Sequence, residues 1–269
     1  MLMTFFQALL LGIIQGLTEF LPISSTAHLL LAQSVFRLPA GDEMFAFLVL
    51  VQWGTVLALL VYFWREWWAL AKAFVARPFS NLRNRLAWYV LLGTLPALVA
   101  GALLRDAVSA LFSQPLLEAG IRLWMAALLL GIAELFSKPQ KTLETLNGRD
   151  ALWIGLFQVL AIFPGASRSG TTLSGGLLRG FDRPSAARFA FLLAMPVMVA
   201  AGGFELLGLV ARPPFAAFFP TLALGMLTAA LSGWLAIRWL LRYVQHHSLW
   251  IFTIYCALMG SISLGAYFW

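Results

Sequence analysis

Two short polar clusters hold most of the side chains of this chain that could do chemistry. The first, residues 15–28, contains a carboxylate, an imidazole and several hydroxyls, and the second, residues 163–172, contains a guanidinium and four hydroxyls. Ionisable groups inside otherwise apolar segments usually mark a pathway or a reaction site. Together, these groups are sufficient to bind and cleave a phosphate ester.

Three residues of the first cluster are candidates for catalysis. Ser25 and His28 are spaced i, i+3, on one face of a helix that begins near Ser25. His28 could accept a proton from Ser25 or from a water molecule as a general base. Glu19, across the loop, could orient His28 or hold a metal ion. The simpler alternative is that the serines only cap a helix and His28 only satisfies a buried hydrogen bond.

Both clusters also have the composition of an anion site. Hydroxyl residues, which are favoured helix N-caps, directly precede a short apolar segment in each; they are Ser24, Ser25 and Thr26, then Ser167, Ser169, Thr171 and Thr172. Two helix N-termini would therefore direct free N–H groups towards one point. Arg168 adds a planar set of donors suited to phosphate oxygens, so we expect it to act in catalysis. The alternative for Arg168 is a structural ion pair with Glu19, and a carboxylate substrate would fit the N-termini equally well.

The rest of the chain predicts a membrane protein. Of its 269 residues, 61% are hydrophobic and 11% are charged, whereas soluble domains have about 25% charged residues. Six apolar stretches have about the 20 residues that a membrane helix needs; they are 44–64, 86–105, 117–136, 187–209, 216–237 and 249–268. We therefore predict an all-α, polytopic integral membrane protein with six transmembrane helices.

The segments around the two clusters differ from these six stretches. Residues 5–17 and 151–163 are apolar arms of thirteen residues, which is too short to cross a hydrocarbon core of about 30 Å. Each is followed by polar, proline-containing backbone and a second short apolar arm. Irregular backbone at membrane depth is tolerated only inside protein or beside a wet cavity. We therefore predict re-entrant helix–loop–helix hairpins over 5–36 and 151–181.

The distribution of Lys and Arg supports this topology. Thirteen of them fall in the loops 65–85, 137–149, 179–188 and 238–242 if each hairpin returns to the side from which it enters. The opposite side then keeps four, which are Arg37, Arg105, Arg122 and Arg212. Such a bias places the richer side in the cytoplasm. Because the net charge of +7 is spread over these loops, it predicts no nucleic-acid partner.

An internal repeat relates the two halves. Ala8, Gly12 and Gln15 match residues 143 positions later, and Pro22 and Ser25 match Pro164 and Ser167 after a gap of one residue. We predict two inverted repeats, 1–136 and 151–269, within a single membrane domain, each a hairpin plus three spans with the site near the midplane. The alternative is chance identity in a chain rich in Leu and Ala.

The two clusters, from Gln15 to His28 and from Pro164 to Thr172, closely resemble the signature motifs of the undecaprenyl-diphosphate phosphatases, the bacitracin-resistance family. Residues 187–196 also resemble that family, and the likeness covers essentially the whole chain. The resemblance implies an enzyme of the bacterial cytoplasmic membrane that removes the terminal phosphate of undecaprenyl diphosphate at the outer side. This reaction recycles the lipid carrier for peptidoglycan synthesis and confers bacitracin resistance.

The resemblance also implies roles for individual residues. Glu19 and Gln15 match the acidic motif, Ser25 and His28 match the active-site serine and histidine, and Ser167, Arg168 and Thr172 match the phosphate-binding residues. Together with the hydroxyls of the two clusters, this gives Glu19, Ser25, His28 and Arg168 as the expected catalytic residues. The expected diphosphate-binding residues are Gln15, Ser24, Thr26, Ser167, Ser169 and Thr172. The resemblance implies a divalent cation, Mg²⁺, with Glu19 as its candidate ligand, and a homodimer. Gln15 cannot ionise, so this chain does not offer the metal a carboxylate at that position. Ala27 stands where the family usually has glycine.

Two other classes of function remain open at this level. Inverted repeats with broken helices are typical of transporters, so the fold could instead move a lipid phosphate across the membrane. A non-catalytic scaffold predicts that Glu19, His28 and Arg168 can all be neutralised without loss. Within the enzyme hypothesis, a phosphoserine intermediate and direct attack by water are both compatible with these residues.

Overall fold

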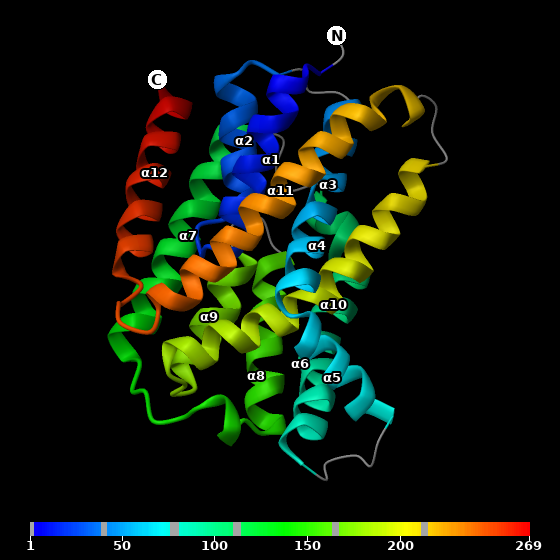
Figure 1. The fold of residues 1–269 in the computed structure, drawn as a ribbon. Helices are drawn as coiled ribbons and strands as arrows, with labels where there is room; N and C mark the ends of the chain where they lie inside the picture. Colours follow the sequence, from blue (N-terminus) through cyan, green and yellow to red (C-terminus); the bar gives the residue numbers. More distant parts are fainter. Residues whose placement is uncertain (1–2, 39–41, 76–80, 110–113, 163–166, 211–214) are drawn as a thin grey trace.

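A computed structural model describes residues 3–38, 42–75, 81–109, 114–162, 167–210 and 215–269, and this part of the chain is helical without a β-strand. Its helices (Figure 1) are α1 (Phe5–Phe20), α2 (Ser25–Val35), α3 (Asp42–Leu50), α4 (Gln52–Tyr62), α5 (Trp64–Val75), α6 (Leu82–Ser109), α7 (Pro115–Phe136), α8 (Gly148–Val159), α9 (Arg168–Leu178), α10 (Arg183–Val210), α11 (Phe215–Tyr243) and α12 (Trp250–Phe268), with 3₁₀ turns at Leu143–Thr145 and Leu160–Ile162.

Five helices are long and apolar enough to cross a membrane. They are Leu82–Leu104, Pro115–Phe136, Arg183–Phe204, Phe219–Tyr243 and Trp250–Phe268, and they correspond to five of the six predicted stretches. The sixth, 44–64, is more complicated, because Ala46–Tyr62 and Trp64–Phe74 pass the same test only as a pair bent by 78°. The bend is at Phe63, which is buried and ends α4.

The first helix ends within the first polar cluster, as predicted, whereas the break predicted around Pro164 lies at residues 163–166, outside the described residues. α1 ends where Leu21 becomes extended and Pro22 follows, and Ser24 then adopts a left-handed backbone conformation with φ 68°. Proline cannot donate a backbone hydrogen bond and disfavours helical conformation in the residue before it. α2 returns alongside α1 and α9 returns alongside α8, so that two hairpins approach each other from opposite ends of the molecule (Figure 1).

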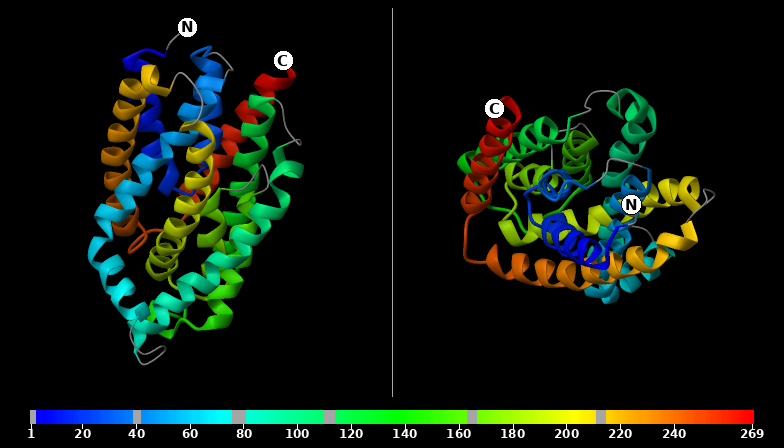
Figure 2. Two further views of the ribbon diagram at one scale, coloured as in Figure 1. Left: turned by 90° about the vertical axis from the view of Figure 1, so that its right-hand side faces the viewer. Right: turned by 90° about the horizontal axis from the view of Figure 1, so that it is seen from above.

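Glycines allow both hairpins to pack closely against long helices. The left and right views of Figure 2 place α1 alongside α11. A Cβ on Gly16 would lie 2.0 Å from Ser232 Oγ of α11, and a Cβ on Gly155 of α8 would lie 2.3 Å from the carbonyl oxygen of Gly93 of α6. Small residues permit this backbone approach between apolar helices. Close contact between helix backbones therefore fixes α1 against α11 and α8 against α6.

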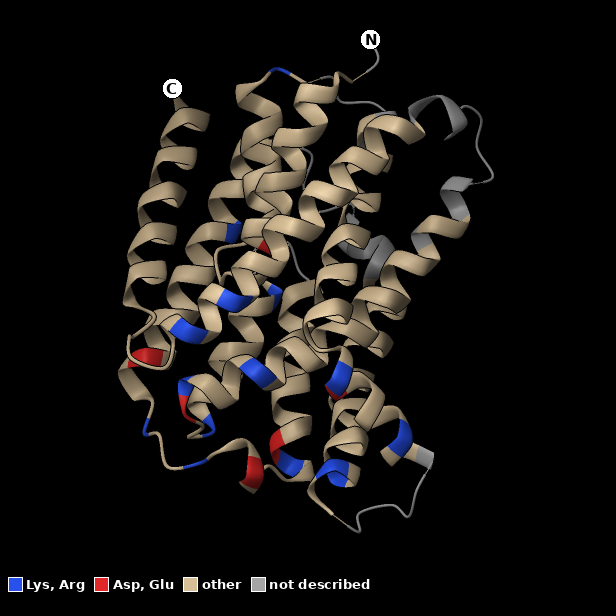
Figure 3. Cartoon of the chain, in the orientation of Figure 1, with Lys and Arg blue, Asp and Glu red and all other residues tan. Residues whose placement is uncertain are grey.

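Basic side chains gather at one end of the molecule. Figure 3 shows most Lys and Arg in the lower part, near the start of α8 and around α5, with few in the opposite part. Asp150, which is fully buried, pairs there with Lys141 and with Arg179 at 3.0 and 2.6 Å. The same end therefore anchors α8 to α9 through charge.

Candidate functional site

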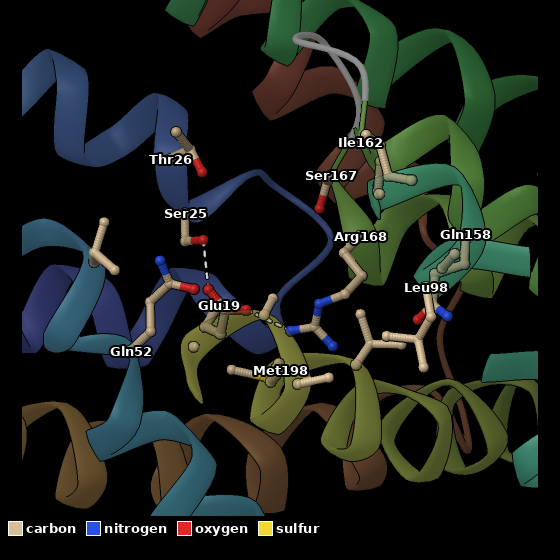
Figure 4. A pocket seen from close by; sticks show the side chains of 18 of the residues that line it. Glu19, Ser25, Thr26, Gln52, Leu98, Gln158, Ile162, Ser167, Arg168 and Met198 are labelled. Carbon is tan, nitrogen blue, oxygen red and sulfur yellow. Dashed lines mark hydrogen bonds and ion pairs between the residues drawn. The ribbon is translucent and has the colours of Figure 1, made fainter. Parts of the chain in front are cut away.

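The tips of the two hairpins meet at an ion pair. Arg168, the first residue of α9, contacts Glu19 in the last turn of α1, although 149 positions separate them (Figure 4). Glu19 is 8% exposed and the Arg168 side chain is 17% exposed. The predicted convergence of these two charges is therefore present, and it takes the form of the direct contact that we considered as the structural alternative for Arg168.

Glu19 also organises the first hairpin. Ser25 Oγ donates to Glu19 Oε2 at 2.6 Å, and Gln15 Nε2 donates to the same oxygen at 2.9 Å. A carboxylate at this distance from a serine hydroxyl can take its proton. Gln15 therefore orients the carboxylate from within α1, and its expected contact with the diphosphate stays a prediction.

His28 is not placed as we expected. Its Nδ1 lies 2.8 Å from the carbonyl oxygen of Ser24, and its Nε2 lies 2.7 Å from the hydroxyl of Tyr255 on α12. The imidazole also stacks on the Tyr255 ring, with centroids 5.6 Å apart. The expected Ser25–His28 hydrogen bond is replaced by Ser25–Glu19, because the first turn of α2 directs Ser25 towards α1 and His28 towards α12. A catalytic role for His28 stays a prediction, and its contacts hold the strained Ser24 segment.

The capping predictions are confirmed for the second hairpin only. Ser167 precedes α9, and its hydroxyl accepts from Gly170 N at 3.3 Å. Ser24 precedes α2 without a side-chain cap, and Ser25 is turned towards Glu19. Of the two helix N-termini, that of α9 is therefore the one with a side-chain cap.

The remaining predicted hydroxyls secure the second tip. Ser169 Oγ donates to the carbonyl oxygen of Leu21 at 3.0 Å, which ties α9 to the break of the first hairpin. Thr172 is 1% exposed and donates to the carbonyl oxygen of Arg168 at 2.8 Å. Both therefore position Arg168 in this structure.

A cavity of about 940 Å³ opens beside the ion pair, within the range of about 300–1,000 Å³ typical of ligand pockets. Six predicted site residues line it, namely Glu19, Ser24, Ser25, Thr26, Ser167 and Arg168. Gln15, His28, Ser169 and Thr172 are not among its lining residues. Much of the remaining lining is apolar and comes from α6 and α10, where Leu98, Met198 and Phe204 face the cavity.

Three polar lining residues were not among the predicted site residues. Arg122 of α7 pairs with Glu118 at 2.5 Å, as its i, i+4 spacing predicts, yet it also lines the cavity. Gln52 and Gln158 line it as well. The one sequence signal for any of them is the repeat, because Gln158 occupies the position equivalent to Gln15.

The site offers one carboxylate to a cation. Among the residues that the structure describes, no group of three or more His, Cys, Asp or Glu side chains could hold a metal ion. Glu19 is the carboxylate of the cavity lining. Mg²⁺ is often held by one or two carboxylates together with substrate phosphates, so the residues fit a cation that binds jointly with a phosphorylated substrate.

Comparison with known proteins agrees with this geometry. A sequence model of the family described as bacitracin resistance protein BacA matches residues 8–262, which include both hairpins and the cavity lining. The chain belongs to this family. A BacA-family protein with five apolar helices of membrane-spanning length is a multi-pass membrane protein.

Alignments with individual relatives cover nearly the whole of this chain. Proteins named undecaprenyl-diphosphatase from Myxococcus xanthus, Nocardioides sp. and Synechococcus elongatus are 42%, 39% and 40% identical to it. Each alignment covers 97% of this chain, and 89%, 95% and 92% of the respective relative. The similarity therefore extends over all of the elements that build the site.

Proposed function

We propose that the protein hydrolyses undecaprenyl diphosphate to undecaprenyl phosphate and inorganic phosphate, which recycles the lipid carrier for cell-wall synthesis and confers resistance to bacitracin. The observation that carries this proposal is the convergence of Ser25, Glu19 and Arg168 beside one cavity in a multi-pass membrane protein. The names of the relatives supply the substrate.

In the proposed reaction, Ser25 Oγ attacks the terminal phosphorus and its proton passes to Glu19, 2.6 Å away. The new Ser25–phosphorus bond forms as the anhydride bond breaks, and undecaprenyl phosphate leaves. Water then attacks the phosphoserine, the Ser25–phosphorus bond breaks, and one proton of the water returns to Ser25 while Glu19 releases its proton to solvent. Arg168 and the capped N-terminus of α9 stabilise the charge on the transferred phosphoryl group.

The second form of the reaction has no covalent intermediate. Glu19 then takes the proton of an attacking water molecule, and Ser25 binds a phosphate oxygen. Labelled phosphate trapped on Ser25 distinguishes the two forms, since only the first places phosphorus on that hydroxyl.

We assign Mg²⁺ to Glu19 and the diphosphate oxygens, where it would neutralise charge on the headgroup. Gln15 supplies no second carboxylate, and its amide already donates to Glu19. The lining residues would therefore offer such a cation a single anionic ligand, the Glu19 carboxylate.

We also propose how the molecule sits in the bilayer. Both hairpins are re-entrant, α3 and α4 form the sixth span, and residues 1–136 and 151–269 are inverted repeats. The end rich in Lys and Arg faces the cytoplasm (Figure 3), which directs the cavity towards the outer side of the bacterial cytoplasmic membrane. Apolar side chains of α6 and α10 receive the first isoprenoid units, and two copies associate as a homodimer.

The test is release of inorganic phosphate from undecaprenyl diphosphate by the protein purified in detergent. Ser25→Ala, Glu19→Gln and Arg168→Met should each lower kcat by about 10²–10⁴-fold. Ser261→Ala is a matched serine control, because that hydroxyl is exposed on α12 and donates to Ala257 O. Arg188→Met is the control for Arg168, since Arg188 forms an exposed pair with Glu66.

Two outcomes would reject the proposal. Absence of phosphate release by the wild-type protein would favour transport, because transport needs two compartments and hydrolysis does not. Full activity of both the Ser25→Ala and the Glu19→Gln variants would show that neither residue takes part in the reaction.

A further inference from the structure

Gln158 is a buried polar side chain of α8 that lines the cavity. It is 1% exposed, and neither its Oε1 nor its Nε2 has a hydrogen-bond partner among the residues that the structure describes. Burial of an amide that makes no hydrogen bond is unfavourable, and the large majority of buried polar side chains in proteins have a protein or water partner. A ligand in the cavity can provide one.

Its counterpart in the first hairpin behaves differently. Gln15 occupies the equivalent position of the repeat, and its Nε2 donates to Glu19. Gln15 does not line the cavity, whereas Gln158 does. The second hairpin has no carboxylate one turn after its glutamine, because Ile162 follows at the equivalent spacing. The Gln158 amide can therefore form a hydrogen bond with a ligand in the cavity.

The position of Gln158 relative to the reacting groups indicates which part of the ligand it contacts. In Figure 4, Ser25 and Gln158 lie on opposite sides of the Arg168 guanidinium. Attacking and leaving oxygens are roughly in line in phosphoryl transfer, so the leaving group lies on the side of the transferred phosphorus away from Ser25. That group is the phosphate attached to the lipid.

We infer that Gln158 donates from Nε2 to a non-bridging oxygen of the lipid-side phosphate. This inference rests on the proposed function for the orientation of the diphosphate. A neutral amide can bind this phosphate in the substrate and in the lipid monophosphate product without adding a charge that would retain the product.

The experiment measures affinity for the product as well as turnover. Gln158→Leu removes both polar atoms at similar volume, and Gln158→Glu keeps the shape but places a carboxylate against the phosphate. Undecaprenyl phosphate and inorganic phosphate are used as separate inhibitors of phosphate release. Binding of undecaprenyl phosphate is also followed by its effect on Tm in detergent, which needs no turnover.

Ser174→Ala is the matched control. The Ser174 hydroxyl is also fully buried and unpartnered, but it does not line the cavity. It separates the effect of removing any buried orphan group from the effect of removing one that faces the ligand.

For Gln158→Leu we expect KM for undecaprenyl diphosphate and the inhibition constant of undecaprenyl phosphate to rise about tenfold, and more for Gln158→Glu. Inhibition by inorganic phosphate should be unchanged, and Ser174→Ala should match the wild type. Unchanged affinity of Gln158→Leu for undecaprenyl phosphate would overturn the inference, and so would equal weakening of both inhibitors. Because the Tm shift reports binding alone, an inactive wild type would reject the proposed reaction and leave the Gln158 result readable.

Discussion

The α1–α2 hairpin and the α8–α9 hairpin share a plan but contribute opposite halves of the site. The first supplies the hydroxyl and the carboxylate, Ser25 and Glu19, and the second supplies Arg168 on a capped helix N-terminus. Neither hairpin alone contains both the group that accepts a proton and the group that stabilises phosphate. The proposed reaction therefore needs both hairpins, which come from distant parts of the chain.

The two hairpins are also stabilised differently. The base of α8–α9 is fixed by buried Asp150, which pairs with Lys141 and Arg179. The ion pair that the structure describes for α1–α2 is the contact of Glu19 with Arg168 itself. The first hairpin thus depends on its partner for charge compensation, whereas the second has its own.

Exchange of the charges of Glu19 and Arg168 should have the largest effect. It tests whether the two hairpins supply different groups to the site. Glu19→Arg and Arg168→Glu should each lower kcat by about 10²–10⁴-fold. The double exchange should restore the ion pair and the Tm but not phosphate release, because Ser25 then faces a guanidinium. The same exchange at Glu66 and Arg188, an exposed pair, is the control. Recovery of activity in the Glu19–Arg168 exchange would show that the pair is only structural.

Asp150→Asn should break the anchor that distinguishes the second hairpin. Asp150 accepts hydrogen bonds from Lys141 and Arg179, so we expect a loss of about 1.5–3 kcal/mol in the free energy of unfolding. Unfolding in SDS-titrated micelles measures the loss. Glu66→Gln, which removes an exposed partner, should cost under about 1 kcal/mol. Equal effects of the two would remove the distinction between the hairpins.

Gly155→Ala tests the approach of α8 to α6. The added methyl would overlap the Gly93 carbonyl, and overpacking of this kind costs about 1–3 kcal/mol. Gly203→Ala is the control on α10, where a Cβ would meet nothing within 4 Å. Melting of the two variants in the same detergent compares them, and a Gly155→Ala Tm at or above that of Gly203→Ala would contradict the close contact.

Tyr255→Phe should have the smallest effect. It tests whether His28 of α2 positions the first hairpin or transfers a proton. It removes the hydroxyl 2.7 Å from His28 Nε2, which is worth about 0.5–1.5 kcal/mol, so kcat should fall less than about tenfold. If His28 positions the Ser24 segment, His28→Ala should lower kcat by a similar factor. A fall of more than about 100-fold in His28→Ala alone would identify His28 as a proton-transfer group.

Local patterns predicted much of the fold. Pro22 and the hydroxyls after it indicated the first break, Ser167 indicated the start of α9, and five apolar stretches became helices of membrane-spanning length. The bend of 78° after Tyr62 was not predicted. Trp64 continues the apolar pattern of α4, and the direction that α5 takes depends on packing against α6, which no local pattern records.

The sequence predicted which candidate residues come together better than it predicted the contacts between them. Clustering of charged residues in apolar segments identified Glu19 and Arg168, but the choice of Glu19 as the partner of Ser25 depends on how α2 leaves the break. The Tyr255 partner of His28 lies 227 positions away in sequence. Gln158 lines the cavity because helices from other parts of the chain complete the cavity around it. The repeat therefore showed that Gln158 is equivalent to Gln15, but it could not show that Gln158 lines a cavity.

The contact of Glu19 with Arg168 links two events in the catalytic cycle. Arg168 is already occupied by an anion of the protein, so an arriving phosphate must displace that anion. The displaced carboxylate is the one that Ser25 already faces. In the proposed reaction, headgroup arrival therefore frees the Glu19 carboxylate for Ser25, and between turnovers Arg168 keeps that carboxylate paired.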